Sequence, residues 1–240
     1  MISADPTGWK TSADAWAVHV ERDVLRLHLL DPIYREWLSE KPIGMCVDIG
    51  CGEGRLIRLV RELGGDSIGV EPFPEMANYA RTKTPGAEII EAFAEDLPFG
   101  DESFDTVLCC LVLLDVPDYA AAIREFARIL KPGGRVLVAN LHPIITNSFQ
   151  SWTKDSEGRV VSYPVESYTF ESGGRARWSG IDVVNYHRPL GAYLNAFLDA
   201  GLTLTKFVEP TPSLEILKQF PQFWTEYMTP FTLMMEWTKR

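Results

Sequence analysis

Cysteine is scarce in this sequence: Cys46, Cys51, Cys109 and Cys110 form no CxxC motif, and four cysteines in a chain of this length do not indicate a disulfide framework. A chain of 240 residues buries enough surface to fold without such links. No HExxH motif is present either. We therefore expect buried, reduced thiols and no metal site. Because Cys109 and Cys110 are adjacent in an apolar run, they should point to opposite faces of a strand.

Two further absences exclude whole classes of function. No apolar run approaches the roughly 20 residues of a membrane-spanning helix, and Met1 to Lys10 lacks the basic and apolar regions of a signal peptide. Basic residues are outnumbered, 23 against 33 acidic ones, which gives a net charge of −10. Proteins that bind nucleic acids or anionic membranes present a basic face. We therefore expect a cytoplasmic protein with neither kind of partner.

Short apolar runs alternate with helical segments along the first 140 residues. The expected strands are residues 45–49, 67–71, 87–91, 104–112 and 135–139. The expected helices are residues 55–63, 74–82 and 118–130, the last capped by Asp118. This alternation predicts an α/β fold, in which helices cover both faces of a parallel sheet. A ligand site is then expected beyond the C-terminal ends of the strands.

Two regions interrupt the alternation. Residues 9–40 precede the first strand and are expected to be helical, whereas residues 141–188 contain several short strand-like runs. A segment of the latter length indicates a functional insertion. The last hundred residues, from Phe149 onward, also hold 16 of the 27 aromatic residues. Most of these should pack the C-terminal strands, and some are candidates to line an apolar pocket.

The first expected strand runs into a glycine-rich loop, Asp48-Ile-Gly50-Cys-Gly52-Glu53-Gly54. Glycines permit a tight turn and let a ligand approach the backbone. The loop is neither a Walker motif nor GxGxxG, whose third glycine would fall at Arg55. Glu53 is also unfavourable beside a pyrophosphate, so the loop indicates a cationic or zwitterionic ligand.

Glu71 ends the second expected strand, 21 residues after Gly50. An acidic residue at this place can accept hydrogen bonds from both hydroxyl groups of a ribose. The two features together predict a ligand that has a ribose but no phosphate next to the glycine-rich loop.

At this point the sequence resembles the class I S-adenosylmethionine-dependent methyltransferases, most specifically from Val47 to Ala139. Five segments carry the resemblance, and they occur in the family's order: Asp48-x-Gly50-x-Gly52-x-Gly54, Gly69-Val70-Glu71, Ala94-Glu95-Asp96-Leu97-Pro98-Phe99, Ser103-Phe104-Asp105-x-Val107 and Arg128-Ile-Leu-Lys-Pro-Gly-Gly134. The resemblance implies a doubly wound, mostly parallel, Rossmann-like sheet of seven strands in the order 3-2-1-4-5-7-6. Thr203–Glu209 would be the sixth strand, and residues 230–238 the antiparallel seventh.

The resemblance also implies a single domain over residues 1–240. Its expected parts are a helical lid (1–40), a cofactor-binding core (41–140), an acceptor-side insertion (141–188) and the C-terminal part of the core (189–240). In this arrangement the lid closes over the cofactor, and the insertion walls the acceptor pocket from the other side.

Cofactor contacts can be carried over by position. Gly50, Cys51 and Gly52 would border the methionine moiety of S-adenosylmethionine, and Asp48 would steady its ammonium group. The other cofactor contacts implied are Glu71 and Pro72 at the ribose, Ala94 and Glu95 at the adenine, and Leu111 near the sulfonium. Phe93 departs from the family, which often has Asp or Asn there; either this ring stacks on the adenine, or Glu95 or Asp96 replaces the missing contact. Asp48 as a turn cap is the structural alternative.

The acceptor side also departs from the family, because Leu113-Leu114-Asp115 stands where many members have Leu-His-His. Asp115 and His142 follow the fourth and fifth strands and are the candidate catalytic residues, since either can act as a general base. Candidate substrate contacts are Trp16, Tyr168 and His187. The alternatives are a helix cap for Asp115, a hydrogen-bonded structural role for His142 and a capping role for His187. Arg188 and Glu209 are expected to form a structural ion pair.

The predicted function is methyl transfer from S-adenosylmethionine, with S-adenosylhomocysteine as the product, to an oxygen or nitrogen atom of a small molecule. Carbon is a less favoured acceptor atom. Methyl transfer depends mainly on alignment and exclusion of water, and a base is needed only where the acceptor loses a proton. A non-catalytic S-adenosylmethionine-binding module is the alternative. Arg55 and Glu53 disfavour a nicotinamide-dependent dehydrogenase.

Overall fold

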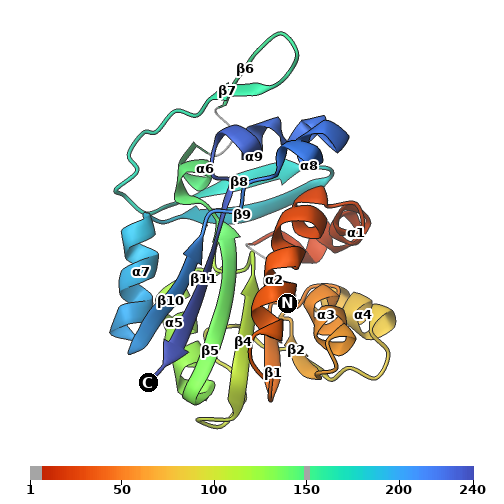
Figure 1. The fold of residues 1–240 in the computed structure, drawn as a ribbon, viewed down its shortest axis with the longest axis vertical. Helices are drawn as coiled ribbons and strands as arrows, with labels where there is room; N and C mark the ends of the chain where they lie inside the picture. The colour runs from red at the N-terminus through yellow and green to blue at the C-terminus, as the bar shows by residue number, and fades with distance from the viewer. Residues whose placement is uncertain (1–6, 149–151) are drawn as a thin grey trace, which may run out of the picture.

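The computed structural model describes residues 7–148 and 152–240 and is built around a seven-stranded sheet (Figure 1). The strands are β1 (Cys46–Ile49), β2 (Ser67–Val70), β3 (Ile89–Ile90), β4 (Phe104–Cys110), β5 (Leu130–Leu141), β10 (Leu202–Val208) and β11 (Thr232–Lys239). Their order is β10-β11-β5-β4-β1-β2-β3, and β11 runs antiparallel to both neighbours. With β10 and β11 counted as the sixth and seventh strands, this confirms the predicted order and the antiparallel last strand.

Helices cover both faces of the sheet, as the alternation predicted. One face packs against α5 (Tyr119–Ile129) and α7 (Leu190–Asp199), and the other against α2 (Asp31–Ser39) and α3 (Arg55–Glu62). Successive residues of β4 are divided between the two layers: Cys109 is buried in the first and Cys110 in the second. This alternation explains why five of the seven residues of β4 are apolar.

Most elements of the core begin and end within two residues of their predicted bounds. Helix α4 (Pro74–Lys83) starts at its proline, and the Asp118 carboxylate caps α5 by accepting from the Ala121 amide at 2.9 Å. Strand β5 differs, because it begins at Leu130, inside the predicted end of α5 and its glycine turn. The register between β4 and β5 shifts there, which accommodates the extra residues.

The segment before β1 is helical, as predicted. It contains α1 (Trp9–Val20), a five-residue π-helix η1 (Arg26–Leu30) and α2. Helix α1 packs against strand β9 (Ile181–His187), which belongs to the insertion, and also against α4. The N-terminal segment therefore bridges the insertion and the core.

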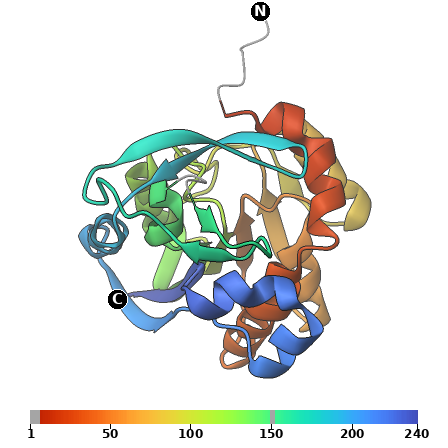
Figure 2. The ribbon, with the colours of Figure 1, turned by 90° about the horizontal axis from the view of Figure 1, so that it is seen from above.

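The insertion after β5 lies beyond the C-terminal ends of the parallel strands (Figures 1 and 2). It contains α6 (Pro143–Ser148) and two hairpins, β6 (Thr153–Lys154) with β7 (Val160–Ser162) and β8 (Ser172–Trp178) with β9. The helices α8 (Leu214–Gln219), η2 (Pro221–Phe223) and α9 (Trp224–Met228) lie over the same end. None of the helices within residues 7–148 and 152–240 is long and apolar enough to cross a membrane.

Candidate functional site

The glycine-rich loop after β1 needs its glycines for two different reasons. Gly50 and Gly52 both have positive φ angles, 66° and 56°, which L side chains rarely adopt. A Cβ atom on Gly50 would lie 2.4 Å from Val112 Cγ2, so this glycine lets two loops touch. A Cβ atom on Gly52 would meet only Met76 and Trp16, each at 3.6 Å, and would instead intrude on the space beside the loop.

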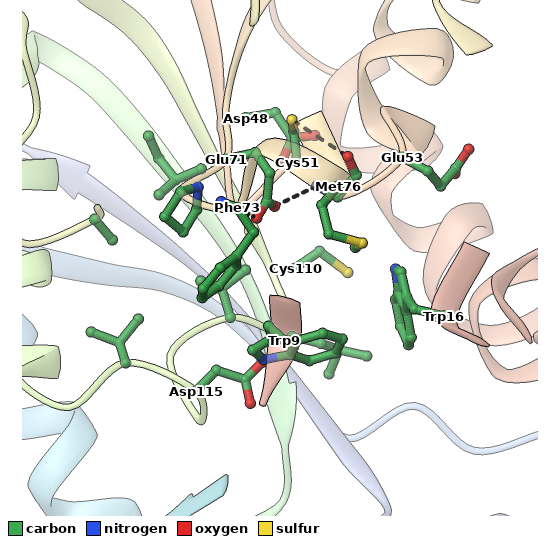
Figure 3. Close-up of a pocket in the computed structure, with 18 of the residues that line it drawn as sticks. Trp9, Trp16, Asp48, Cys51, Glu53, Glu71, Phe73, Met76, Cys110 and Asp115 are labelled. Carbon is green, nitrogen blue, oxygen red and sulfur yellow. Dashed lines mark hydrogen bonds between the residues drawn. The ribbon is translucent and has the colours of Figure 1, made fainter. Parts of the chain in front are cut away.

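That space is a cavity of about 720 Å³ at the C-terminal ends of β1, β2 and β4, and Figure 3 shows its lining. A volume of this size suits a small-molecule ligand. The structure brings together eleven of the residues singled out in the sequence around this one cavity: Trp16, Asp48, Gly50, Cys51, Gly52, Glu71, Pro72, Ala94, Glu95, Leu111 and Asp115.

Asp48 and Glu71 are two buried carboxyl groups in the cavity wall. Burial, with repulsion from Glu71, raises the pKa of Asp48 to about 8, and burial raises the pKa of Glu71 to about 7. Glu71 accepts hydrogen bonds from the amides of Gly52 at 3.0 Å and Phe73 at 3.3 Å, one to each oxygen. No residue of the described chain donates a hydrogen bond to the Asp48 side chain, so its oxygens are available to a ligand.

The sequence position of Glu53 suggested that its charge favours a cationic ligand, but in the structure Glu53 pairs with basic residues of the protein. Its carboxylate accepts two hydrogen bonds from Arg58, each of 2.7 Å, and lies 3.6 Å from Lys83. The negative charge of Glu53 is therefore compensated within the protein. The charge that favours a cationic ligand comes from Asp48 and Glu71 instead.

Two arginines in the cavity lining were missed from the sequence. Arg26 pairs with Asp23 at 3.0 Å, and its guanidinium lies 4.5 Å from the centre of the Trp16 ring. Arg55 contacts Asp31 and donates to Cys110 Sγ at 3.3 Å, and burial lowers its pKa to about 10. The i,i+3 spacing of Asp23 and Arg26 is a sequence signal for the first pair, but nothing in it points to a ligand site.

Leu111 follows β4 with a φ angle of 56°, which is strained for a leucine. Its amide donates to the Ala139 carbonyl oxygen at 2.8 Å, which fixes this conformation. The turn directs the following loop, residues 112–117, along the cavity, where Val112, Asp115, Val116 and Pro117 form part of the wall. Local strain held in place by the surrounding structure is a feature of ligand sites.

Asp115 is the acidic residue on that loop. Its Oδ1 accepts a hydrogen bond from Asn185 Nδ2 at 2.5 Å, and the Trp9 side chain lies beside the carboxylate, where its indole N–H favours the ionised form and holds the pKa down. Burial nevertheless raises the pKa of Asp115 well above its usual range. Figure 3 shows Trp9 beside Asp115 at one end of the cavity. Asn185 and Trp9 lie far from Asp115 in the sequence, which offers no local signal for either contact.

The other candidate acceptor-side residues do not line this cavity. His142 is buried: its Nε2 lies 3.0 Å from Glu209 Oε1, and its Nδ1 accepts from the Ile144 amide at 3.2 Å. Both ring nitrogens of His187 are engaged too, Nδ1 with Thr146 Oγ1 at 3.0 Å and Nε2 with the Tyr168 carbonyl oxygen at 2.9 Å.

The predicted ion pair between Arg188 and Glu209 is wrong. Glu209 pairs with His142, while Arg188 lies 3.9 Å from Glu171 and donates to backbone carbonyls. The reason is the course of β5, which extends to Leu141 and continues into His142, whose amide donates to the Phe231 carbonyl oxygen at 2.8 Å.

The aromatic side chains of the cavity come from the first hundred residues. They are Trp9, Trp16, Phe73 and Phe93, and the described aromatic residues of the last hundred positions do not line it. Phe149 lies outside the described residues. Phe93 is 57% exposed and meets Phe73 edge to face, with ring centres 6.3 Å apart. Of the C-terminal aromatic residues, Tyr193, Phe197 and Trp237 pack against the sheet, the last two as a stacked pair.

Comparisons with known proteins agree with this site. Residues 47–138 match the family described as "Methyltransferase domain". An uncharacterized methyltransferase of Mycobacterium tuberculosis is 38% identical over 101 residues, which are 42% of this chain and 41% of the relative. The ubiquinone biosynthesis O-methyltransferase of Xanthomonas euvesicatoria is 34% identical over 127 residues, 48% of this chain and 52% of the relative. The chain thus spans about half the length, or less, of these relatives.

The fold agrees over a longer stretch. The crystal structure of an S-adenosylmethionine-dependent methyltransferase from Mesorhizobium loti superposes with a TM-score of 0.76 at 29% identity, and the match covers 87% of this chain and 96% of that one. The fold and the glycine-rich loop define a Rossmann-like ligand-binding domain. Residues 47–138 match the methyltransferase domain family, and the predicted resemblance to class I S-adenosylmethionine-dependent methyltransferases is confirmed.

Proposed function

We propose that this chain binds S-adenosylmethionine in the cavity and transfers its methyl group to an oxygen or nitrogen atom of a small molecule. The observation that carries the proposal is the pair of buried carboxyl groups, Asp48 and Glu71, beside the open backbone at Gly52. Two buried acids are costly in a free protein. A ligand with an ammonium group and two adjacent hydroxyls would satisfy both.

The cofactor fits the residues present. Glu71 keeps free lone pairs for the ribose hydroxyls, because its two backbone hydrogen bonds use only one on each oxygen. Asp48 would receive the ammonium group, and the guanidinium of Arg26 or Arg55 would face the carboxylate. The exposed ring of Phe93 offers a stacking surface for the adenine, next to Ala94.

When bound, S-adenosylmethionine would supply a sulfonium methyl group, which would pass to a lone pair of the acceptor while the electron pair of the old bond stays on sulfur. Asp115 faces the cavity and takes the proton that the acceptor N–H or O–H group loses. Helix α1 and η1 cover the cavity as the lid, and Leu111 shapes the wall near the reacting centre. The rest of the rate enhancement comes from the alignment of cofactor and acceptor by these groups.

A small-molecule acceptor is favoured by the size of the cavity, about 720 Å³, and by the net charge of −10, which disfavours nucleic acid. The relative named for ubiquinone biosynthesis makes hydroxylated aromatic compounds a sensible starting set. The test is transfer of a labelled methyl group from S-adenosylmethionine to matched panels of phenols and amines. Binding of S-adenosylmethionine with no labelled product on any acceptor would instead indicate a non-catalytic binding module.

The raised pKa values of Asp48 and Glu71 predict that cofactor binding releases protons. A bound cation favours the ionised carboxylates, so affinity should rise as the pH increases from about 6 to about 9. Calorimetry near pH 7 in buffers of different ionisation enthalpy should show about one proton released per cofactor. The release should shrink in Asp48→Asn. A heat of binding that does not depend on the buffer would contradict the assignment.

The same pKa shifts predict the stability of the free protein. The folded chain holds these two protons more tightly than the unfolded chain does, because the pKa values of about 8 and about 7 exceed the usual values for these side chains. The free energy of unfolding should therefore fall as the pH rises from about 4 to about 8 and level off above that range. Saturating cofactor should reduce this fall.

A further inference from the structure

Strand β9 of the insertion forms two hydrogen bonds with the loop that carries Asp115. The Asn185 side chain donates to Asp115 Oδ1 at 2.5 Å, and the next residue along the strand, Tyr186, donates its amide to the Leu114 carbonyl oxygen at 2.7 Å. One of these bonds fixes the backbone and the other fixes the carboxylate. The carboxylate is therefore held in place by an element about 70 residues away in the sequence.

Arg188, directly after β9, fixes the same loop on both sides of Asp115. Its guanidinium is buried and donates to the carbonyl oxygens of Leu113 at 2.7 Å, Val116 at 2.5 Å and Pro117 at 2.9 Å. Three carbonyls around one guanidinium leave the loop little freedom to move. The orientation of Asp115 is thus set by the end of the insertion.

The opposite part of β9 holds the beginning of helix α1. The Val184 amide donates to the Thr7 carbonyl oxygen at 2.8 Å, and the Asp182 amide donates to Ser12 Oγ at 3.1 Å. Gly8, between them, fits so tightly that a Cβ atom would lie 2.2 Å from the Asp182 carbonyl oxygen. This docking places Trp9, the first residue of α1, with its indole beside the Asp115 carboxylate.

From this arrangement we propose that Asn185 and Trp9 are positioning residues, which together hold the Asp115 carboxylate toward the methyl acceptor with β9 as their common support. The inference rests on the proposed function, in which Asp115 takes the acceptor's proton. Two N–H donors fix the plane of the carboxylate and leave its remaining lone pairs for the acceptor.

Several other ionisable groups face Asp115 from the elements around it. Arg26 of η1 favours the charged form, while Glu71 after β2 opposes it. Cys109 in β4 and Tyr193 in α7 also interact with its charge. All four stay unchanged when Asn185 or Trp9 is replaced, so a change in the titration of Asp115 reports the loss of the donor.

The test is the titration of Asp115 itself, which needs no knowledge of the acceptor. In full-length protein labelled with ¹³C at the aspartate side-chain carboxyl carbons, the Asp115 signal is the one lost in Asp115→Asn. Asn185→Leu removes one donor while keeping the number and branching of the side chain's heavy atoms, and Trp9→Phe removes the other without touching β9. We expect each variant to move the Asp115 titration upward by about one pH unit, because a donor that favours the charged form is lost.

Tyr186→Phe is the matched control, since it lies on the same strand and keeps the ring over which Arg188 sits. In this variant Asp115 should titrate at the same pH as in the parent protein. With a labelled methyl donor and a working acceptor, Asn185→Leu should lower kcat about tenfold and leave cofactor affinity unchanged. The acidic limb of its pH–rate profile should move to higher pH by the same amount as the Asp115 titration.

The outcomes separate the two proposals. An Asp115 titration that is unmoved in both Asn185→Leu and Trp9→Phe overturns the positioning role. If Asn185→Leu does not fold, Trp9→Phe alone decides the matter. Unchanged turnover in Asp115→Asn would instead remove Asp115 from the mechanism, whatever the titration shows.

Discussion

Replacing Glu71 by alanine should weaken S-adenosylmethionine binding by about 10²–10⁴-fold. The variant loses the acceptor for two ribose hydroxyls, and a hydrogen bond to a charged group contributes roughly 1.5–3 kcal/mol. It also frees the amides of Gly52 and Phe73, which loosens the glycine-rich loop. Calorimetric titration with S-adenosylmethionine measures the loss directly.

Glu71→Gln distinguishes recognition from folding. A glutamine oxygen still accepts one backbone hydrogen bond, and the neutral side chain avoids the cost of burying a charge. We expect thermal stability at pH 8 to be equal to or higher than that of the parent protein, while affinity falls by about 10²-fold. Glu91→Gln is the control, because Glu91 is exposed and pairs with Arg81 at 3.0 Å outside the cavity. Parent-like affinity in Glu71→Ala would place the ribose elsewhere.

Replacing Asp115 by asparagine should lower kcat by about 10²–10⁴-fold and leave cofactor affinity within about threefold. The amide keeps the size of the side chain but cannot take a proton. Because burial raises the pKa of Asp115, turnover of the parent protein should increase with pH above the usual range of an aspartate and reach a plateau once the side chain is ionised. The acidic limb should vanish in the variant.

Asp118→Asn is the matched control, three residues further on. Its side chain caps α5, a role that asparagine performs equally well.

For His142→Ala we expect a decrease in kcat of less than about tenfold, much smaller than the effect expected of a general base. The His142 ring is engaged with Glu209 and the Ile144 amide, so the cost should appear mainly as lower thermal stability. A larger loss in His142→Ala than in Asp115→Asn would reverse these assignments.

The core strands could be predicted from the sequence because their signals are local. In β4, burial on both faces makes five of the seven residues apolar, and glycine turns mark the ends of the neighbouring helices. The strands of the insertion carry a weaker signal, because residues 141–188 show only several short strand-like runs with no clear bounds. Strand β8, with the sequence Ser172-Gly-Gly-Arg-Ala-Arg-Trp178, is largely exposed and pairs only with β9. Neither an apolar run nor a regular alternation marks it.

The candidate site also contains some residues that the sequence could predict and others that it could not. Asp48, Gly52 and Glu71 belong to motifs with fixed spacing, and the structure places all three at one cavity. The partners of Asp115 come from distant elements, so only tertiary packing reveals them. His142 follows a central strand, as Asp115 does, and this position suggested a shared crevice. The hydrogen bond from its amide to Phe231 directs the chain toward β11 instead.

In the proposed reaction, helix α1 carries one tryptophan to each of the two reactants, Trp9 to Asp115 on the acceptor side and Trp16 to the space beside Gly52 on the cofactor side. A movement of α1 that admits or releases the cofactor must therefore also withdraw a donor from Asp115. Product exchange and chemistry then need different positions of the same helix and cannot overlap in time. The lifetime of α1 on β9, which amide hydrogen exchange of these two elements can follow, sets an upper bound on how often the enzyme can turn over.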